Sequence, residues 1–313
     1  MPVRNSLFLL GMCLMLLLGG CAMPNDVEPE ALAVGIVQGL PLPSVSPLPL
    51  PMYKDYTLLV RKADYAPARW EPAEGCYLGA EVLGDKSIGG RMDAFERRTN
   101  TAHAIYACEM TLGGEYPALW VLECIANGKT PCVIVRPANA HAPFDLDLLE
   151  QTARDVGTYG VPLFVQLLPY STARYDRAGY AAFYAAARQV FAEHAPNAAI
   201  VWNVEDGMEG AAAFYPGDAC VDWVGVVLKE GASDAAALAA FVQTYQQQKP
   251  IMVTLAVSHF STKNNTYDIE NAAAHLARMY AEIANRYPRV KAVLYRNGSE
   301  VDRAAQEEGV WHD

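Results

Sequence analysis

The sequence from Cys76 onward predicts a (β/α)8 barrel. Eight apolar, β-favouring runs occur between Cys76 and Asn297, and helix-like patterns separate them along the chain. Alternating strands and helices with apolar strands imply a parallel sheet covered by helices. From Cys76 to Asp313 the sequence holds 238 residues, close to the roughly 250 that are typical of such a barrel. A doubly wound open sheet is the alternative, but eight strands is the number that a closed barrel needs.

The expected elements follow in chain order. Two helix patterns are clear, because apolar residues after Asp176 and again from Ile269 to Tyr287 recur on one face at helical spacing. Asp145 is expected to cap the N-terminus of another helix, and Gly157 to lie just beyond its end. We expect strands near residues 76–83, 103–109, 131–137, 161–168, 198–204, 221–228, 250–257 and 290–296.

Residues 1–20 have the pattern of a secretory signal. Arg4 supplies a positive charge, and Leu7 to Leu18 forms a short apolar run. The segment Leu18-Gly19-Gly20-Cys21 resembles the lipobox of bacterial lipoproteins, which implies a lipid on Cys21. The mature protein would then be anchored to the extracytoplasmic face of the cell membrane. An ordinary signal peptide or a transmembrane helix is the alternative, although the apolar run is short for a span.

Residues 21–52 are predicted to form a tether ahead of a domain at 53–313. Proline favours extended polyproline II, so the segment should act as a semi-rigid spacer. Lys54 to Tyr65 is expected to add a strand or two before the barrel. The prolines of the spacer alternate with Leu, Ser and Val, and are Pro41, Pro43, Pro47, Pro49 and Pro51.

Composition excludes several classes of partner. The formal net charge is −11, and removal of Arg4 with the signal makes the mature chain more negative still. An acidic protein is a poor partner for nucleic acid or anionic lipid. We expect a monomer. No spacing of His or Cys residues suits a set of metal ligands, so neither a metal nor another cofactor is predicted. Buried free thiols are expected rather than disulfides at Cys76, Cys108, Cys124, Cys132 and Cys220, an odd number in mostly apolar runs.

A turn followed by an apolar strand carries a resemblance to a known family. The segment Tyr215-Pro216-Gly217-Asp218-Ala219-Cys220-Val221-Asp222-Trp223-Val224-Gly225-Val226 resembles the YPGDxxVDWVGV segment of glycoside hydrolase family 26, the β-mannanases, where it leads into barrel strand six. Residues 75–80, 197–203 and 249–254 resemble the first, fifth and seventh strands of that family. The resemblance covers most of 76–297 and implies a (β/α)8 barrel acting on β-mannan or a related β-glycan.

The catalytic positions that the resemblance implies are not occupied by glutamate. The family places its acid/base on strand four in HEMNG and its nucleophile on strand seven in EFG, roughly 5–5.5 Å apart in a retaining enzyme. Here Pro169-Tyr170 stands in place of His-Glu, Leu255 stands in place of the nucleophile, and the family's tyrosine after strand six falls at about Lys229. Tyrosine, with an ordinary pKa of about 10, is a poor acid, and leucine cannot attack. We therefore expect a non-hydrolytic carbohydrate-binding pseudoenzyme.

Polar residues at the strand ends are the candidate site, because active residues of this barrel class lie at the C-terminal ends of strands. The alternatives are that charged residues there are solvated loop residues and that Trp202 and Tyr215 pack in the core. Two other functions remain besides non-hydrolytic carbohydrate binding. One is an active hydrolase with relocated carboxylates, in which Glu205 pairs with Glu81, Glu109 or Glu230. The other is a structural envelope protein that binds another protein. Asp206, His259, Arg296 and Asn297 also reach the expected mouth. The expected substrate-binding residues are Glu81, Glu109, Arg136, Tyr170, Trp202, Asn203, Glu205, Tyr215, Lys229 and Glu230.

Overall fold

The computed structural model describes residues 67–84, 88–138, 144–171, 175–206, 209–229, 234–257, 260–261, 266–267 and 269–297. The predicted signal peptide, the lipid on Cys21, the tether and the strands expected in Lys54 to Tyr65 lie outside the described residues. Within these ranges, no helix combines the length and the apolar character that crossing a membrane requires.

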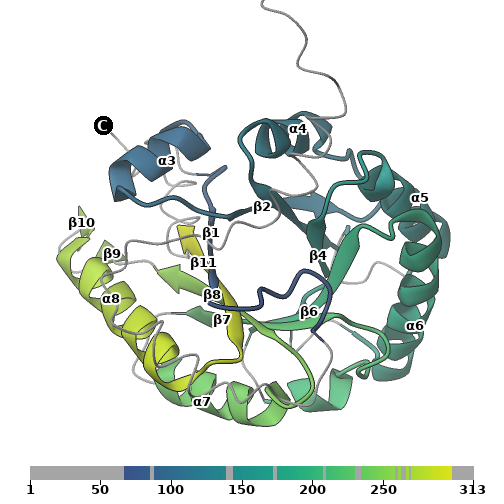
Figure 1. Ribbon diagram of the computed structural model, residues 1–313. Helices are drawn as coiled ribbons and strands as arrows, with labels where there is room; N and C mark the ends of the chain where they lie inside the picture. Colours follow the sequence, from purple (N-terminus) through teal and green to yellow (C-terminus); the bar gives the residue numbers. More distant parts are fainter. Residues whose placement is uncertain are drawn as a thin grey trace, which may run out of the picture.

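Parallel strands close into a barrel, as predicted, and an open sheet is excluded. The sheet runs β4-β3-β2-β1-β11-β8-β7-β6, and pairing of β4 with β6 joins its two ends (Figure 1). The two-residue strand β5 (Tyr170–Ser171) lies beside the end of β6. The eight barrel strands, each overlapping its predicted run, are β1 (Tyr77–Glu81), β2 (Ile105–Thr111), β3 (Thr130–Arg136), β4 (Leu163–Leu167), β6 (Ala198–Asp206), β7 (Trp223–Lys229), β8 (Ile251–Val257) and β11 (Val290–Asn297).

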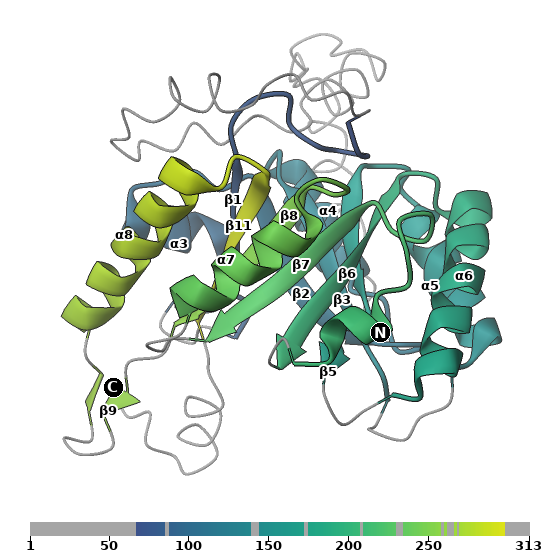
Figure 2. The same cartoon turned by 90° about the horizontal axis from the view of Figure 1, so that it is seen from below.

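Helices surround the barrel, as Figures 1 and 2 show. Asp145 caps α5 as predicted, since its carboxylate accepts hydrogen bonds from the backbone N–H groups of Asp147 and Leu148. The helices are α3 (Met92–Thr99), α4 (Ala118–Ala126), α5 (Leu146–Gly157), α6 (Arg177–His194), α7 (Asp234–Tyr245) and α8 (Ile269–Arg286), with a 3-10 turn η2 (Ala211–Phe214) and a short hairpin of β9 (Phe260–Ser261) and β10 (Thr266–Tyr267).

The prediction for Gly157 was wrong. Gly157 is the last residue of α5, Thr158 is its C-cap, and the left-handed backbone conformation occurs at Gly160 instead. A β-carbon on Gly157 would lie 2.0 Å from the carbonyl oxygen of His194, at the end of α6. The glycine is therefore required by a close approach of two helices, not by the ending of one.

Two apolar layers hold the barrel together. The inner layer fills the barrel and includes Tyr77, Phe164, Trp223 and Met252. The outer layer packs the strands against the helices and includes Trp202 and Leu255. Because side chains alternate along a strand, every second residue after an inner-layer residue also faces the barrel axis. This alternation decides which side chains reach the C-terminal mouth.

Residues 67–76 close the opposite end of the barrel. Ala68 and Trp70 pack against the inner layer. The Trp70 indole N–H donates to the carbonyl of Asn197 at 2.9 Å, and the Trp223 indole N–H donates to the carbonyl of Arg69 at 2.7 Å. Trp223 thus belongs to the core, in agreement with its mid-strand position among valines. The cysteines of the described part are free thiols, as expected.

Candidate binding site at the barrel mouth

The C-terminal strand ends bring charged side chains together from five strands. Glu81 ends β1, Glu109 lies on β2, Arg136 ends β3, Glu205 lies on β6 and Arg296 lies on β11. Each follows an inner-layer residue at an even spacing, for example Cys132 and Ile134 before Arg136, and Ala199 and Val201 before Glu205. Alternation therefore aims all five toward the barrel axis. We call them the charged network.

Arginines connect the network around the mouth. Arg136 donates to Glu205 through Nη1 at 2.6 Å and Nη2 at 2.8 Å, passing over β4, and Nη2 also contacts Glu109 at 2.5 Å. Arg296 donates from Nε to Glu81 at 2.5 Å and from Nη1 to Glu205 at 3.3 Å. The contact between Arg296 and Glu205 crosses β8 and β7, which lie between β11 and β6 in the sheet. Bidentate guanidinium–carboxylate pairs of this kind are strong and geometrically fixed.

The carboxylates of the network have different electrostatic environments. Burial alone would raise the pKa of Glu205, but the hydrogen bonds and positive charges of Arg136 and Arg296 hold it below its ordinary value. The pKa of Glu109 is lowered in the same way, chiefly by Arg136 acting against burial. Burial raises the pKa of Glu81 above its ordinary value, although the charge of Arg296 opposes the shift. Glu81 is therefore the carboxyl group of the network that gains a proton most readily.

Uncharged polar side chains occupy inward positions that precede the charged residues along β4 and β6 or lie beside them. The Asn203 amide donates from Nδ2 to Gln166 Oε1 at 2.9 Å, and the Gln166 amide nitrogen contacts the Met252 sulfur at 3.4 Å. Gly225 faces Asn203 on the next strand. Asn203, predicted to bind substrate, is 1% exposed and lies one inward position below Glu205 on β6.

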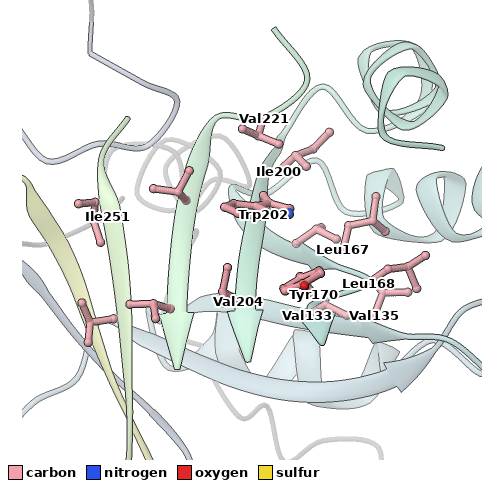
Figure 3. Close-up of a cluster of buried hydrophobic side chains, with 14 of the residues drawn as sticks. Val133, Val135, Leu167, Leu168, Tyr170, Ile200, Trp202, Val204, Val221 and Ile251 are labelled. Carbon is pink, nitrogen blue, oxygen red and sulfur yellow. The ribbon is translucent and has the colours of Figure 1, made fainter. Parts of the chain in front are cut away.

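The predicted aromatic residues Trp202 and Tyr215 are not brought to the mouth. Trp202 is fully buried in the outer layer, drawn in Figure 3, where its ring packs against those of Tyr215 and Tyr245. The Tyr215 hydroxyl donates to the carboxylate of Asp218 at 2.6 Å. Trp202 is one residue from inward-facing Asn203, so alternation turns its ring outward. The core interpretation of Trp202 is the one that the structure supports.

Tyr170 and Leu255 also point away from the mouth. Tyr170 is 2% exposed, and its ring lies 4.8 Å from that of Phe214 within the outer layer (Figure 3). Leu255 is fully buried in the same layer, between inward-facing Thr254 and Ala256. The match to the family motif located these residues along the chain but not on a face of the strand. Leu255 therefore does not line the site.

The side chains that β4 and β8 turn inward near the mouth are Gln166, Thr254 and Ala256, none of them an acid. Sequence reasoning did not select these residues or Gly225 for the site, and Arg296 was only one of several residues expected to reach the mouth. Counting in steps of two along a strand finds them only when one residue that faces the barrel axis is already known. Lys229 ends β7, but its side chain, like those of Asp206 and Asn297, lies outside the described structure, as do Glu230 and His259. Among the described residues, no cluster of three metal-binding side chains occurs.

Comparison with known proteins identifies the architecture. Neither a protein-family model nor a curated protein sequence matches the chain. Among solved structures, the Bacillus subtilis mannanase BCman superposes with a TM-score of 0.51 at 17% identity, over 78% of this chain and 85% of that one. The chain has the (β/α)8 barrel fold of these mannanases.

Two further structures extend the similarity. A β-mannanase from a symbiotic protist of the termite Reticulitermes speratus, solved with a gluco-manno-oligosaccharide, matches at TM-score 0.50 and 14% identity, over 83% of this chain and 87% of that one. A ruminal GH26 endo-β-1,4-mannanase matches at TM-score 0.51 and 9% identity, over 71% and 59% of the two chains. At such identities the similarity shows a shared fold, and the activity of this chain has to be argued from its own site.

Proposed function

We propose that the mouth of the mannanase-like barrel binds a carbohydrate without hydrolysing it. The observation that carries the proposal is the pairing of Glu81, Glu109 and Glu205 with Arg136 and Arg296. A retaining glycosidase needs a nucleophilic carboxylate and an acid roughly 5–5.5 Å apart at the sugar. Here β4 and β8 present Gln166, Thr254 and Ala256 instead of acids. The carboxylate of Glu205 on neighbouring β6 accepts hydrogen bonds from the guanidinium groups of Arg136 and Arg296.

The same arrangement suits sugar recognition. Carboxylates accept and guanidinium groups donate, so the charged network offers both partners to the hydroxyl groups of a sugar. Held by neighbouring strands, these groups are preorganised, which lowers the entropic cost of binding. One structural neighbour holds a gluco-manno-oligosaccharide, which supports a β-glycan as the ligand class.

A binding screen paired with an activity assay tests the proposal. The chain from Tyr53 onward is applied to a glycan array and is incubated with mannan and mixed-linkage β-glucan while reducing sugar is measured. We expect retention on at least one β-glycan and no product above a no-protein control. Steady product release would show that the barrel is an enzyme, and absence of binding to every glycan would refute a carbohydrate function.

A second candidate, a hydrolase with relocated carboxylates, is favoured by one observation. The pKa of Glu81 is raised and the pKa of Glu205 is lowered, although both carboxylates bind Arg296. Such divergence is how glycosidases separate a protonated acid from an ionised nucleophile. In that case Glu81→Gln and Glu205→Gln would each abolish sugar release. The non-hydrolytic proposal expects no release to abolish.

We further propose that the mature protein is held at the extracytoplasmic face of the membrane by a lipid on Cys21. The support is the sequence Leu18-Gly19-Gly20-Cys21 and the proline-rich spacer behind it. Residues 67–76 enter at the end of the barrel opposite the mouth. Such an attachment leaves the mouth open to soluble or polymeric glycans.

A further inference from the structure

Three buried polar atoms in one wall of the barrel have no hydrogen-bond partner among the described residues. They are Oδ1 of Asn203, Oγ1 of Thr254 and Nη2 of Arg296. Their residues are 1%, 2% and 9% exposed. Buried polar groups in folded proteins nearly always have a partner, and one without a partner costs free energy. Three in one place indicate that something outside the described residues pairs with them.

The three atoms come from strands that lie together in the sheet. Asn203 is on β6, Thr254 on β8 and Arg296 on β11, and the sheet order places these strands and β7 side by side. The pairing register of a barrel of this type shifts by about one residue per strand. Asn203 and Thr254 therefore share a layer with Glu81, and Arg296 lies in the next layer toward the mouth. We call Asn203, Thr254 and Arg296 the unpaired trio.

Gly225 leaves room for the amide of Asn203, which packs against its backbone. It lies on β7 opposite Asn203, and a β-carbon there would lie 2.4 Å from Asn203 Oδ1. Any other residue there would collide with this oxygen and displace the Asn203 amide from its position. Turning the amides of Asn203 and Gln166 around together would exchange donor and acceptor, and would still leave one polar atom of Asn203 unpaired.

We propose that the unpaired trio forms a subsite for neighbouring hydroxyl groups of a terminal sugar. This inference rests on the carbohydrate function proposed above and deepens it. Arg296 Nη2 donates, Asn203 Oδ1 accepts, and the Thr254 hydroxyl does either, which matches the donor and acceptor character of a vicinal diol. Arg136 and Glu205 lie in a layer above the trio. A sugar therefore reaches it end-on, as a chain terminus or a monosaccharide, whereas the middle of a polymer would rest on the charged network.

Substitution of Thr254 by valine tests the subsite, because it removes the hydroxyl and keeps the shape. The matched control is Thr152→Val, whose hydroxyl donates to the Leu148 carbonyl at 2.8 Å and accepts from the Gly113 N–H at 3.4 Å. In the full-length protein in detergent, we expect Thr254→Val to keep or raise the thermal unfolding midpoint and Thr152→Val to lower it. Calorimetric titration with mannotriose should show about tenfold weaker binding for Thr254→Val, equivalent to about one hydrogen bond. Thr152→Val should bind as the wild type does.

The outcomes separate the subsite from the carbohydrate function. A Thr254→Val protein that is as destabilised as Thr152→Val has lost a partnered hydroxyl, which overturns the subsite with no ligand needed. A stabilised Thr254→Val protein with unchanged mannotriose affinity shows that the layer encloses only water, and also overturns it. Mannan that binds per unit mass as well as mannotriose would contradict end-on entry. Absence of any sugar binding by the wild type refutes the carbohydrate function and the subsite together.

Discussion

Arg136 donates two hydrogen bonds to Glu205, at 2.6 and 2.8 Å, and so ties the end of β3 to the end of β6 over the end of β4. The two side chains are 20% and 11% exposed. The pair is therefore mostly desolvated, and its two charges depend on each other. Glu205 would retain only the 3.3 Å contact with Arg296 if Arg136 were removed.

We expect Arg136→Met to destabilise the fold by about 2–3 kcal/mol, somewhat below the roughly 3–5 kcal/mol seen when a fully buried pair is broken. Methionine keeps most of the volume of the arginine side chain, so the loss of stability reports on the charge of Glu205 that is left without Arg136. Urea unfolding measures the change. The control is Arg154→Met, which removes an exposed pair with Glu150 on one helix and should change stability by less than about 0.5 kcal/mol. Equal effects in the two variants would show that the pair at the mouth is as weak as a surface pair.

The outward orientation of Leu255 gives a second prediction. Leu255→Ala should cost about 2–5 kcal/mol in the free energy of unfolding, because it opens a cavity between β8 and the helices. Leu119→Ala is the control, since Leu119 is 85% exposed on α4 and its loss should change stability by no more than about 0.5 kcal/mol. A Leu255→Ala protein as stable as the control would show that Leu255 is not packed between β8 and the helices.

The strands could be predicted from the sequence because each is a continuous apolar run, and a barrel strand buried on both faces has that pattern. The faces could not be read from the same runs with equal ease. A run such as Ile251–Val257 is apolar on both sides, so matching a motif located Leu255 without showing that it points outward. Trp202 was given a place in the site for the same reason.

The charged network could be predicted only in part. Glu81, Glu109, Arg136 and Glu205 were identified because they end strands, and strand ends meet at the mouth of a barrel. Their pairing depends on barrel closure and on which strands flank one another, which no local pattern shows. Gly157 demonstrates the same limit, because the carbonyl of His194 that excludes its β-carbon belongs to another helix.

The lipid anchor gives a third prediction. Cys21→Ala should shift the protein from the membrane fraction to the soluble fraction, or leave its signal segment attached, because it removes the thiol that we propose carries the lipid. Cys220→Ala is the control, since Cys220 is a free thiol within the barrel and its loss should leave the distribution unchanged. Immunoblotting of the separated fractions makes the comparison. A Cys21→Ala protein that fractionates as the wild type does would exclude the anchor.

The opposed pKa shifts of Glu205 and Glu81 predict opposite dependences of stability on pH. A carboxyl group whose pKa is lowered by folding contributes stability that is present above its unfolded pKa, about 4.3, and is lost as pH falls through the folded value. Glu205 is such a group, because Arg136 and Arg296 favour its charged form more than burial opposes it. The stability advantage of the wild type over Glu205→Gln should therefore shrink below about pH 4.3.

Glu81 should behave in the opposite way. Burial raises the pKa of Glu81, so the folded protein binds a proton there more readily than the unfolded chain does. The ionised form of Glu81 therefore destabilises the folded state at neutral pH. As pH falls from 7 toward the unfolded value of about 4.3, Glu81 takes up its proton in the folded state, and the wild type should gain stability relative to Glu81→Gln. Urea unfolding of both variants and the wild type at several pH values from 7 to 3.5 makes the comparison. Parallel curves for Glu81→Gln and Glu205→Gln would show that the two carboxylates share one environment, and would remove the electrostatic distinction between them.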